Sequence, residues 1–142
     1  MLVYERLGEE WTNNHPGQQR AAAYCLAVAT AVEAVTAAGV AMLDLRPANV
    51  MWRSRDDGTV DIRLIDFEFV LPEEYLIPAA LVKAQKKDDR YDVTQYTKRG
   101  EHYYASTRIN HYWLRVIQDW ADAHAPGLRA PRGASAFWRS RV

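Results

Sequence analysis

A long stretch without a helix breaker covers residues 18–38 and ends at Gly39. Its centre, AAAYCLAVATAVEAVTAAG, is apolar nearly all round, which is typical of a helix buried inside a protein or of a membrane span. Most of these residues are alanine, which gains little in lipid, and Glu33 lies near the middle, where an acid costs about 3 kcal/mol. We therefore expect a long helix buried inside a folded lobe.

A second pattern, over residues 50–65, predicts a strand pair. Residues 60–64 alternate apolar and polar side chains, the period of a half-buried strand, and residues 50–52 form a short apolar run. The polar turn between them, at residues 56–58, ends in glycine. We expect one small hairpin, in which the end of the second strand lies near the start of the first.

The second half of the chain predicts two more helices and a polar connection. Pro78 interrupts helical spacing over residues 72–87, so the helix there should start near Ala79. The polar residues 86–104 should form a solvated connection. From Ser106 onward apolar residues recur every three or four positions, which predicts a core-facing helix whose tryptophans pack rather than stack on bases. These apolar residues are Ile109, Tyr112, Trp113, Val116, Ile117 and Trp120.

The chain length fits one domain. With 142 residues, we expect one lobe over residues 1–125 and a basic tail over residues 126–142. A flexible end is the simplest interpretation of the tail, and an arm that docks on an anion or a partner is the alternative. The polar connection holds candidate phosphorylation sites at Tyr91, Thr94, Tyr96 and Thr97, although a plain surface loop explains them more simply.

Charge and cysteine content exclude several classes of function. Lys and Arg together number 18, as do Asp and Glu, so no overall charge indicates a nucleic acid or an acidic membrane as partner. Cys25 is the single cysteine, so no disulfide can form within the chain, and we expect a cytoplasmic or nuclear protein. No cluster of Cys and His has the spacing of a zinc site.

Three oxygen-bearing side chains frame the predicted hairpin. Asp44 and Asn49 stand just before its first strand, and Asp66 stands just after its second. Because the hairpin returns the chain, these side chains should share one edge. Mg²⁺ prefers oxygen ligands, usually one or two carboxylates with water and substrate phosphates at the other positions. Taken singly, each residue is also typical of a turn or a helix cap, so the prediction depends on the joint spacing.

These residues stand in two short motifs, Asp-Leu-Arg-Pro-Ala-Asn over residues 44–49 and Asp-Phe-Glu over residues 66–68. Their order and spacing resemble the catalytic loop and metal motif of protein kinases, D-L-x-x-x-N followed by a strand pair and D-F-G. The chain thus resembles the C-terminal lobe of a divergent protein-kinase-like phosphotransferase over roughly residues 1–70. The fold implied is α+β and mainly helical, a kinase-like C-lobe with a small β-hairpin that bears both motifs and with the N-lobe missing.

The resemblance implies a role for each motif residue. Asp44 is similar to the base that orients the acceptor hydroxyl, and Arg46 stands at the position of a lysine that contacts the transferred phosphate. Asn49 and Asp66 correspond to the Mg²⁺ ligands, and ATP is the implied nucleotide. The acceptor is then a protein or a small molecule.

A nucleotide site is implied at the start of the chain as well. Residues 1–7 form a short apolar run that leads into Gly8, in the order expected of a kinase hinge strand. On that resemblance the backbone from Glu5 to Leu7 binds adenine, and Met51 also lies at the nucleotide. An ordinary edge strand fits the local pattern equally well.

Two departures from the kinase pattern affect these expectations. Met42 and Leu43 replace the His-Arg pair that usually precedes the catalytic Asp, which removes an arginine that commonly senses phosphorylation. Glu68 replaces the glycine of D-F-G and removes backbone freedom there. Its carboxylate either binds the metal directly or fixes a neighbouring arginine.

The largest departure is the lack of a Gly-rich phosphate loop, a nucleotide-binding lysine and its paired glutamate, since the chain starts where the hinge strand is expected. Three interpretations follow, in order of preference. The chain is a fragment of a phosphotransferase that is active only in complete form, a pseudokinase-like nucleotide-binding or scaffold module, or a minimal enzyme that works without the missing loop, lysine and glutamate.

Overall fold

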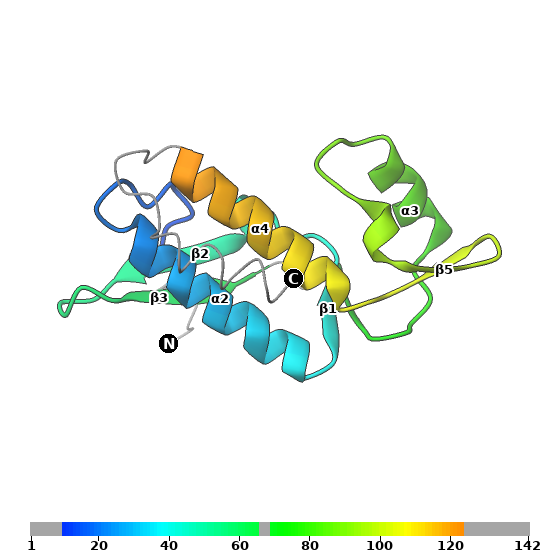
Figure 1. The fold of residues 1–142 in the computed structure, drawn as a ribbon, viewed down its shortest axis with the longest axis horizontal. Coiled ribbons are helices and arrows are strands. Elements are labelled where there is room, and N and C mark those ends of the chain that lie inside the picture. The colour runs from blue at the N-terminus through cyan, green and yellow to red at the C-terminus, as the bar shows by residue number, and fades with distance from the viewer. Residues whose placement is uncertain (1–9, 66–68, 124–142) are drawn as a thin grey trace.

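The computed structural model describes residues 10–65 and 69–123 and forms a small α+β domain (Figure 1). The predicted hinge strand and the basic tail lie outside the described residues. The helices are α2 (Ala21–Ala37), α3 (Ala79–Lys86) and α4 (Arg108–Ala123), with short 3-10 turns η1 (Pro47–Asn49) and η3 (Val93–Gln95). The strands are β1 (Val40–Met42), β2 (Val50–Ser54), β3 (Val60–Leu64), β4 (Val70–Pro72), β5 (Thr97–Arg99) and β6 (His102–Tyr104).

The strands form three antiparallel pairs, β1 with β4, β2 with β3, and β5 with β6. The hairpin of β2 and β3 agrees with the prediction, and its register pairs Val50 with Leu64 and Ser54 with Val60. The expectation of a single hairpin is wrong, because two further pairs are present. Each of those strands has three residues, too few to establish an alternating pattern, and β4 pairs with a strand far from it in sequence.

The helix α2 is the long apolar helix that the sequence predicts, but only one side of it is buried. Tyr24, Val28 and Val32 face the core, where α2 contacts α4 and β3, and the three elements lie together in Figure 1. On the opposite side Leu26 is 60% exposed. The expectation that α2 is buried on all sides is therefore wrong. Its exposed side is mostly alanine, whose small side chains gain little free energy from burial. Within the described ranges no helix is long and apolar enough to cross a membrane.

Helices α3 and α4 start within two residues of the predicted positions. In α4 the apolar repeat faces the core, with Ile109, Trp113 and Ile117 all but completely buried. Gln118, which does not belong to the apolar repeat, is also buried. The buried face of α4 is therefore wider than the apolar repeat alone indicates.

A fully buried asparagine on α4, Asn110, connects this helix to β1 and to the end of α2. The side-chain oxygen of Asn110 accepts a hydrogen bond from the backbone N–H of Met42 at 2.7 Å. Its amide nitrogen donates to the carbonyl of Val40 at 2.8 Å and to the hydroxyl of Thr36 at 3.0 Å. One side chain thus satisfies the polar groups at both ends of β1 and anchors the end of α2.

Replacing this asparagine should destabilise the domain strongly. Asn110→Leu leaves the backbone groups of β1 buried and unpaired, so we expect a loss of about 3 kcal/mol in the free energy of unfolding, measured by urea denaturation. A matched control is Gln118→Leu on the same helix, whose buried amide nitrogen has no hydrogen-bond partner among the described residues. That control should cost less than about 1 kcal/mol. Equal losses in the two variants would contradict the anchoring role of Asn110.

Candidate functional site

The loop of residues 43–49 joins β1 to β2 and carries three of the predicted site residues. Leu43 and Leu45 are fully buried and fix the loop to the core. Arg46 is extended, with φ −68° and ψ 156°, as expected of a residue before proline. Pro47 then begins the 3-10 turn η1, where its missing N–H is tolerated.

Asp44 lies between the two buried leucines, and its side chain is only 6% exposed. Its Oδ1 accepts a hydrogen bond from Nε of Arg46 at 2.9 Å and another from the hydroxyl of Tyr91 at 2.7 Å. No described residue donates a hydrogen bond to Oδ2. The carboxylate is therefore held in place through one oxygen while the other stays available.

Asn49 is also buried, and the backbone of the same loop fixes its orientation. Its amide nitrogen donates to the carbonyl of Asp44 at 2.8 Å, and its backbone N–H donates to the carbonyl of Arg46 at 2.8 Å. Because the amide nitrogen is committed to the loop, the amide oxygen points away from that carbonyl. Asp44, Arg46 and Asn49 thus form one hydrogen-bonded unit within the loop.

The other predicted residues of the site are less fully described. Asp66, like Glu68, lies outside the described residues, but both flanks of this segment are anchored at the loop. The N–H of Ile65 donates to the carbonyl of Asn49 at 3.0 Å, and the carbonyl of Phe69 accepts from the N–H of Leu43 at 2.8 Å. The chain thus enters and leaves residues 66–68 at the two ends of the loop.

The predicted nucleotide contacts are not brought together in the part of the chain that the structure describes. Glu5 and Leu7 lie outside it. Met51 is half-buried in β2, opposite Arg63. Nearer the loop, residues of the loop, of α4 and of the connection after α3 line a cavity of about 400 Å³. They are Arg46, Pro47, Ala48, Asp89, Arg90, Tyr112, Trp113 and Val116.

Tyr91 is the site residue that sequence reasoning missed. It lies edge-on to Trp113, with ring centroids 5.5 Å apart, and it contacts Asp44 across 47 positions of sequence. Burial first, and then its hydrogen bond to the carboxylate of Asp44, raise the pKa of Tyr91 to about 12. No local pattern could have found this contact, because Tyr91 stands in a polar segment that reads as a surface loop.

The connection that carries Tyr91 is held by further polar contacts. Asp88 pairs with Arg90 at 2.7 Å, and the carbonyl of Arg90 accepts from the hydroxyl of Tyr112 at 2.8 Å. On α3, Gln85 donates to the carbonyl of Leu43 at 3.3 Å. The expectation of a merely solvated connection is therefore wrong for Tyr91, which packs against the loop.

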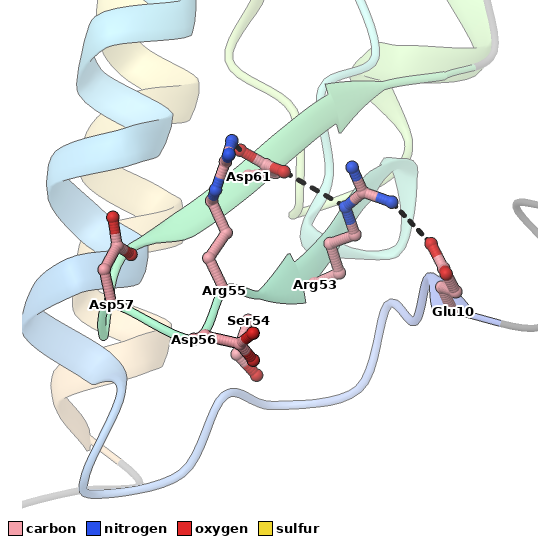
Figure 2. A pocket seen from close by; sticks show the side chains of 7 residues that line it. All are labelled: Glu10, Arg53, Ser54, Arg55, Asp56, Asp57 and Asp61. Atoms are coloured by element: carbon pink, nitrogen blue, oxygen red, sulfur yellow. Dashed lines mark hydrogen bonds and ion pairs between the residues drawn. The ribbon is translucent and has the colours of Figure 1, made fainter.

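A second, strongly charged cavity lies at the far end of the hairpin (Figure 2). Arg53 pairs with Glu10 and with Asp61, and Arg55 pairs with the other oxygen of Asp61. These four charges balance one another, but Asp56 and Asp57 also line the cavity, which therefore carries an excess of negative charge. Ser54 pairs with Val60 at this end, whereas the loop joins the opposite end of β2, so the cavity is separate from Asp44. Among the described residues no group of three His, Cys, Asp or Glu side chains could hold a metal ion.

Comparison with known proteins gives no match to any family model, curated protein or solved structure. The geometry of the loop and the chemistry of its side chains are therefore the basis for inferring a function.

The contact between Tyr91 and Asp44 should appear in the pH dependence of stability. The pKa of Tyr91 in the folded protein, about 12, exceeds the value of about 10 in an unfolded chain. Its contribution to stability is therefore complete below pH ~10 and is lost as the pH rises toward 12.

We expect Tyr91→Phe to be less stable than the parent protein by about 1 kcal/mol at pH 8, and the difference should shrink above pH ~10. Urea denaturation between pH 8 and pH ~11.5 measures it. Tyr75→Phe, at a position 58% exposed, is the matched control and should show no such trend. A difference that stays constant with pH would contradict the contact.

Proposed function

We propose that this chain forms the catalytic-loop side of a protein-kinase-like phosphotransferase site. One observation carries the proposal. Asp44 and Asn49 belong to a single hydrogen-bonded unit, and the backbone of Asn49 also binds Ile65, the residue that precedes Asp66. Asp66 follows Ile65 directly in the sequence, so we expect it near the same edge.

The contact with Tyr91 supports the role of Asp44 as the base. A phenolic hydroxyl donates its proton to Oδ1 at 2.7 Å, the distance at which a general base takes a proton. An acceptor alcohol can bind in the same way. As its oxygen bonds to the γ-phosphorus, the bond from that phosphorus to the β-phosphate oxygen breaks and the acceptor proton passes to Asp44. ADP is the leaving group.

Asn49 and Asp66 are suited to binding Mg²⁺. The amide oxygen of Asn49 points away from the carbonyl that holds its nitrogen, and an amide oxygen with one carboxylate makes a usual protein share of a magnesium shell. Bound there, Mg²⁺ would neutralise charge on the phosphates of ATP. The described carboxylates alone do not make such a site, so the proposal depends on Asp66.

Arg46 is suited to contact the transferred phosphate. Its Nε is committed to Asp44, and its side chain is 29% exposed. The terminal nitrogens of its guanidinium donate no hydrogen bond to any described residue. They can therefore bind an anion without breaking the ion pair that orients the base.

A nucleotide-binding or scaffold module without catalysis is the second candidate. One observation favours it, since Oδ1 of Asp44 already carries two hydrogen bonds, from Arg46 and Tyr91. An acceptor must displace Tyr91 or use Oδ2. If neither occurs, the same loop binds nucleotide and metal without turnover.

Metal binding tests the part of the proposal that both candidates share. Mg²⁺ with ATP should raise the melting temperature, because a ligand that binds only the folded state stabilises it, and Asp66→Asn should abolish the rise. Asp56→Asn is the matched control, an exposed aspartate in the hairpin turn at the far end of the strands. It should leave the rise unchanged. A rise that persists in Asp66→Asn would move the metal to other residues.

Phosphate transfer separates the two candidates. We expect negligible transfer of radiolabelled γ-phosphate by these 142 residues, since charge neutralisation by a Gly-rich loop and a lysine is lacking. A longer chain that supplies both should be active. Its rate should fall roughly a thousandfold or more on Asp44→Ala, equivalent to about 4 kcal/mol of barrier.

The control is Asp56→Asn in the longer chain, which should keep full activity. Robust turnover by the 142-residue chain that disappears on Asp44→Ala would show that the Gly-rich loop and the lysine are not needed. A longer chain that binds ATP without transferring phosphate would favour the scaffold.

A further inference from the structure

A groove runs between α3 and β6, at the end of the molecule opposite the β2 and β3 hairpin in Figure 1. Its volume is about 350 Å³. One wall is a single face of α3, formed by residues three and four positions apart, and the other is the strand β6. The lining residues are Leu76, Ile77, Pro78, Ala79, Val82, Lys83, Lys86, Glu101, His102 and Tyr103.

The floor of this groove is apolar and open. Leu76 is 54% exposed, although it lies beside Ile77 and Val82, which are buried in the core. Leu76 forms an isolated bridge with Tyr104, which fixes its backbone against β6. The groove thus has a rigid base that exposes a large aliphatic side chain to solvent.

Positive charge gathers along the rim without a matching negative charge. The ammonium groups of Lys86 and Lys98 lie 5.0 and 5.6 Å from the centre of the same Tyr103 ring. Neither lysine, nor Lys83, forms an ion pair with any carboxylate of the described residues. Two cations on one ring repel each other, and a bound carboxylate would relieve that repulsion.

The acids nearest the groove do not cancel this charge. Glu74 is already paired with Arg99 at 2.5 Å. Glu101 is the one carboxylate among the lining residues, against the two lining lysines and Lys98. The rim therefore keeps a net positive charge over an apolar floor.

We infer that this groove binds an acidic peptide segment of a partner protein, with an apolar side chain on Leu76 and flanking carboxylates at Lys83, Lys86 and Lys98. Charge complementarity selects this occupant. The basic tail of the chain, residues 126–142, has four arginines and no acid, so the rim repels it. The apolar floor favours a peptide side chain over a nucleic-acid backbone, which binds mainly through its phosphates.

The test uses the full chain and a fluorescein-labelled peptide of sequence EELFEE, with binding measured by fluorescence anisotropy at low salt. We expect saturable binding that weakens at least tenfold in Lys86→Glu and also in Leu76→Ser, and that weakens as salt rises. The matched control is Lys87→Glu, an exposed lysine of the same charge that does not line the groove. It should change the affinity less than twofold. Circular dichroism of each variant shows whether it remains folded.

Several outcomes would overturn the inference. They are the absence of binding at millimolar peptide, equal loss in Lys87→Glu and Lys86→Glu, and equal affinity for the neutral peptide QQLFQQ. Tighter binding of a single-stranded RNA octamer would assign the rim to nucleic acid. Tighter binding of a peptide of residues 1–9 would assign the groove to this chain itself. None of these outcomes bears on phosphate transfer, which involves different residues.

Discussion

The hydrogen bonds of one buried asparagine, Asn110, hold the strand from which the loop starts. Asn110 binds both Val40 and Met42, so the short strand β1 is fixed to α4 through its backbone rather than through side-chain packing alone. A three-residue strand has little stability of its own. The loop with Asp44 starts directly after this strand. Its geometry therefore depends on the side chain of Asn110, which lies 66 positions after Asp44 in the chain.

Hydrogen bonds to buried backbone groups also fix the loop itself. The backbone carbonyls of Asp44 and Asn49 accept hydrogen bonds from Asn49 and Ile65, and no described residue donates to Oδ2 of Asp44 or to the amide oxygen of Asn49. These hydrogen bonds matter because an unpaired buried polar group costs about 1 to 3 kcal/mol. One of the two buried side-chain groups without a partner among the described residues, the ring N–H of Trp113, lies next to the site.

Sequence reasoning reaches the local parts of this structure and stops at the distant contacts. The hairpin follows from alternation over residues 60–64, and α4 follows from its apolar repeat. The joint placement of Asp44 and Asn49 follows from five positions of spacing across a proline. The pairing of β1 with β4 and the contact of Tyr91 with Asp44 join segments far apart in sequence, and no periodicity encodes them.

The helix α3 links the loop to the groove. It has eight residues, too few to be stable alone in water, so its neighbours must hold it in place. On its buried side Gln85 donates to the carbonyl of Leu43, beside Asp44, and accepts from the hydroxyl of Tyr96 at 2.6 Å. On its outer side Lys83 and Lys86 line the groove. Gln85 therefore joins the helix that lines the groove to the loop that carries Asp44.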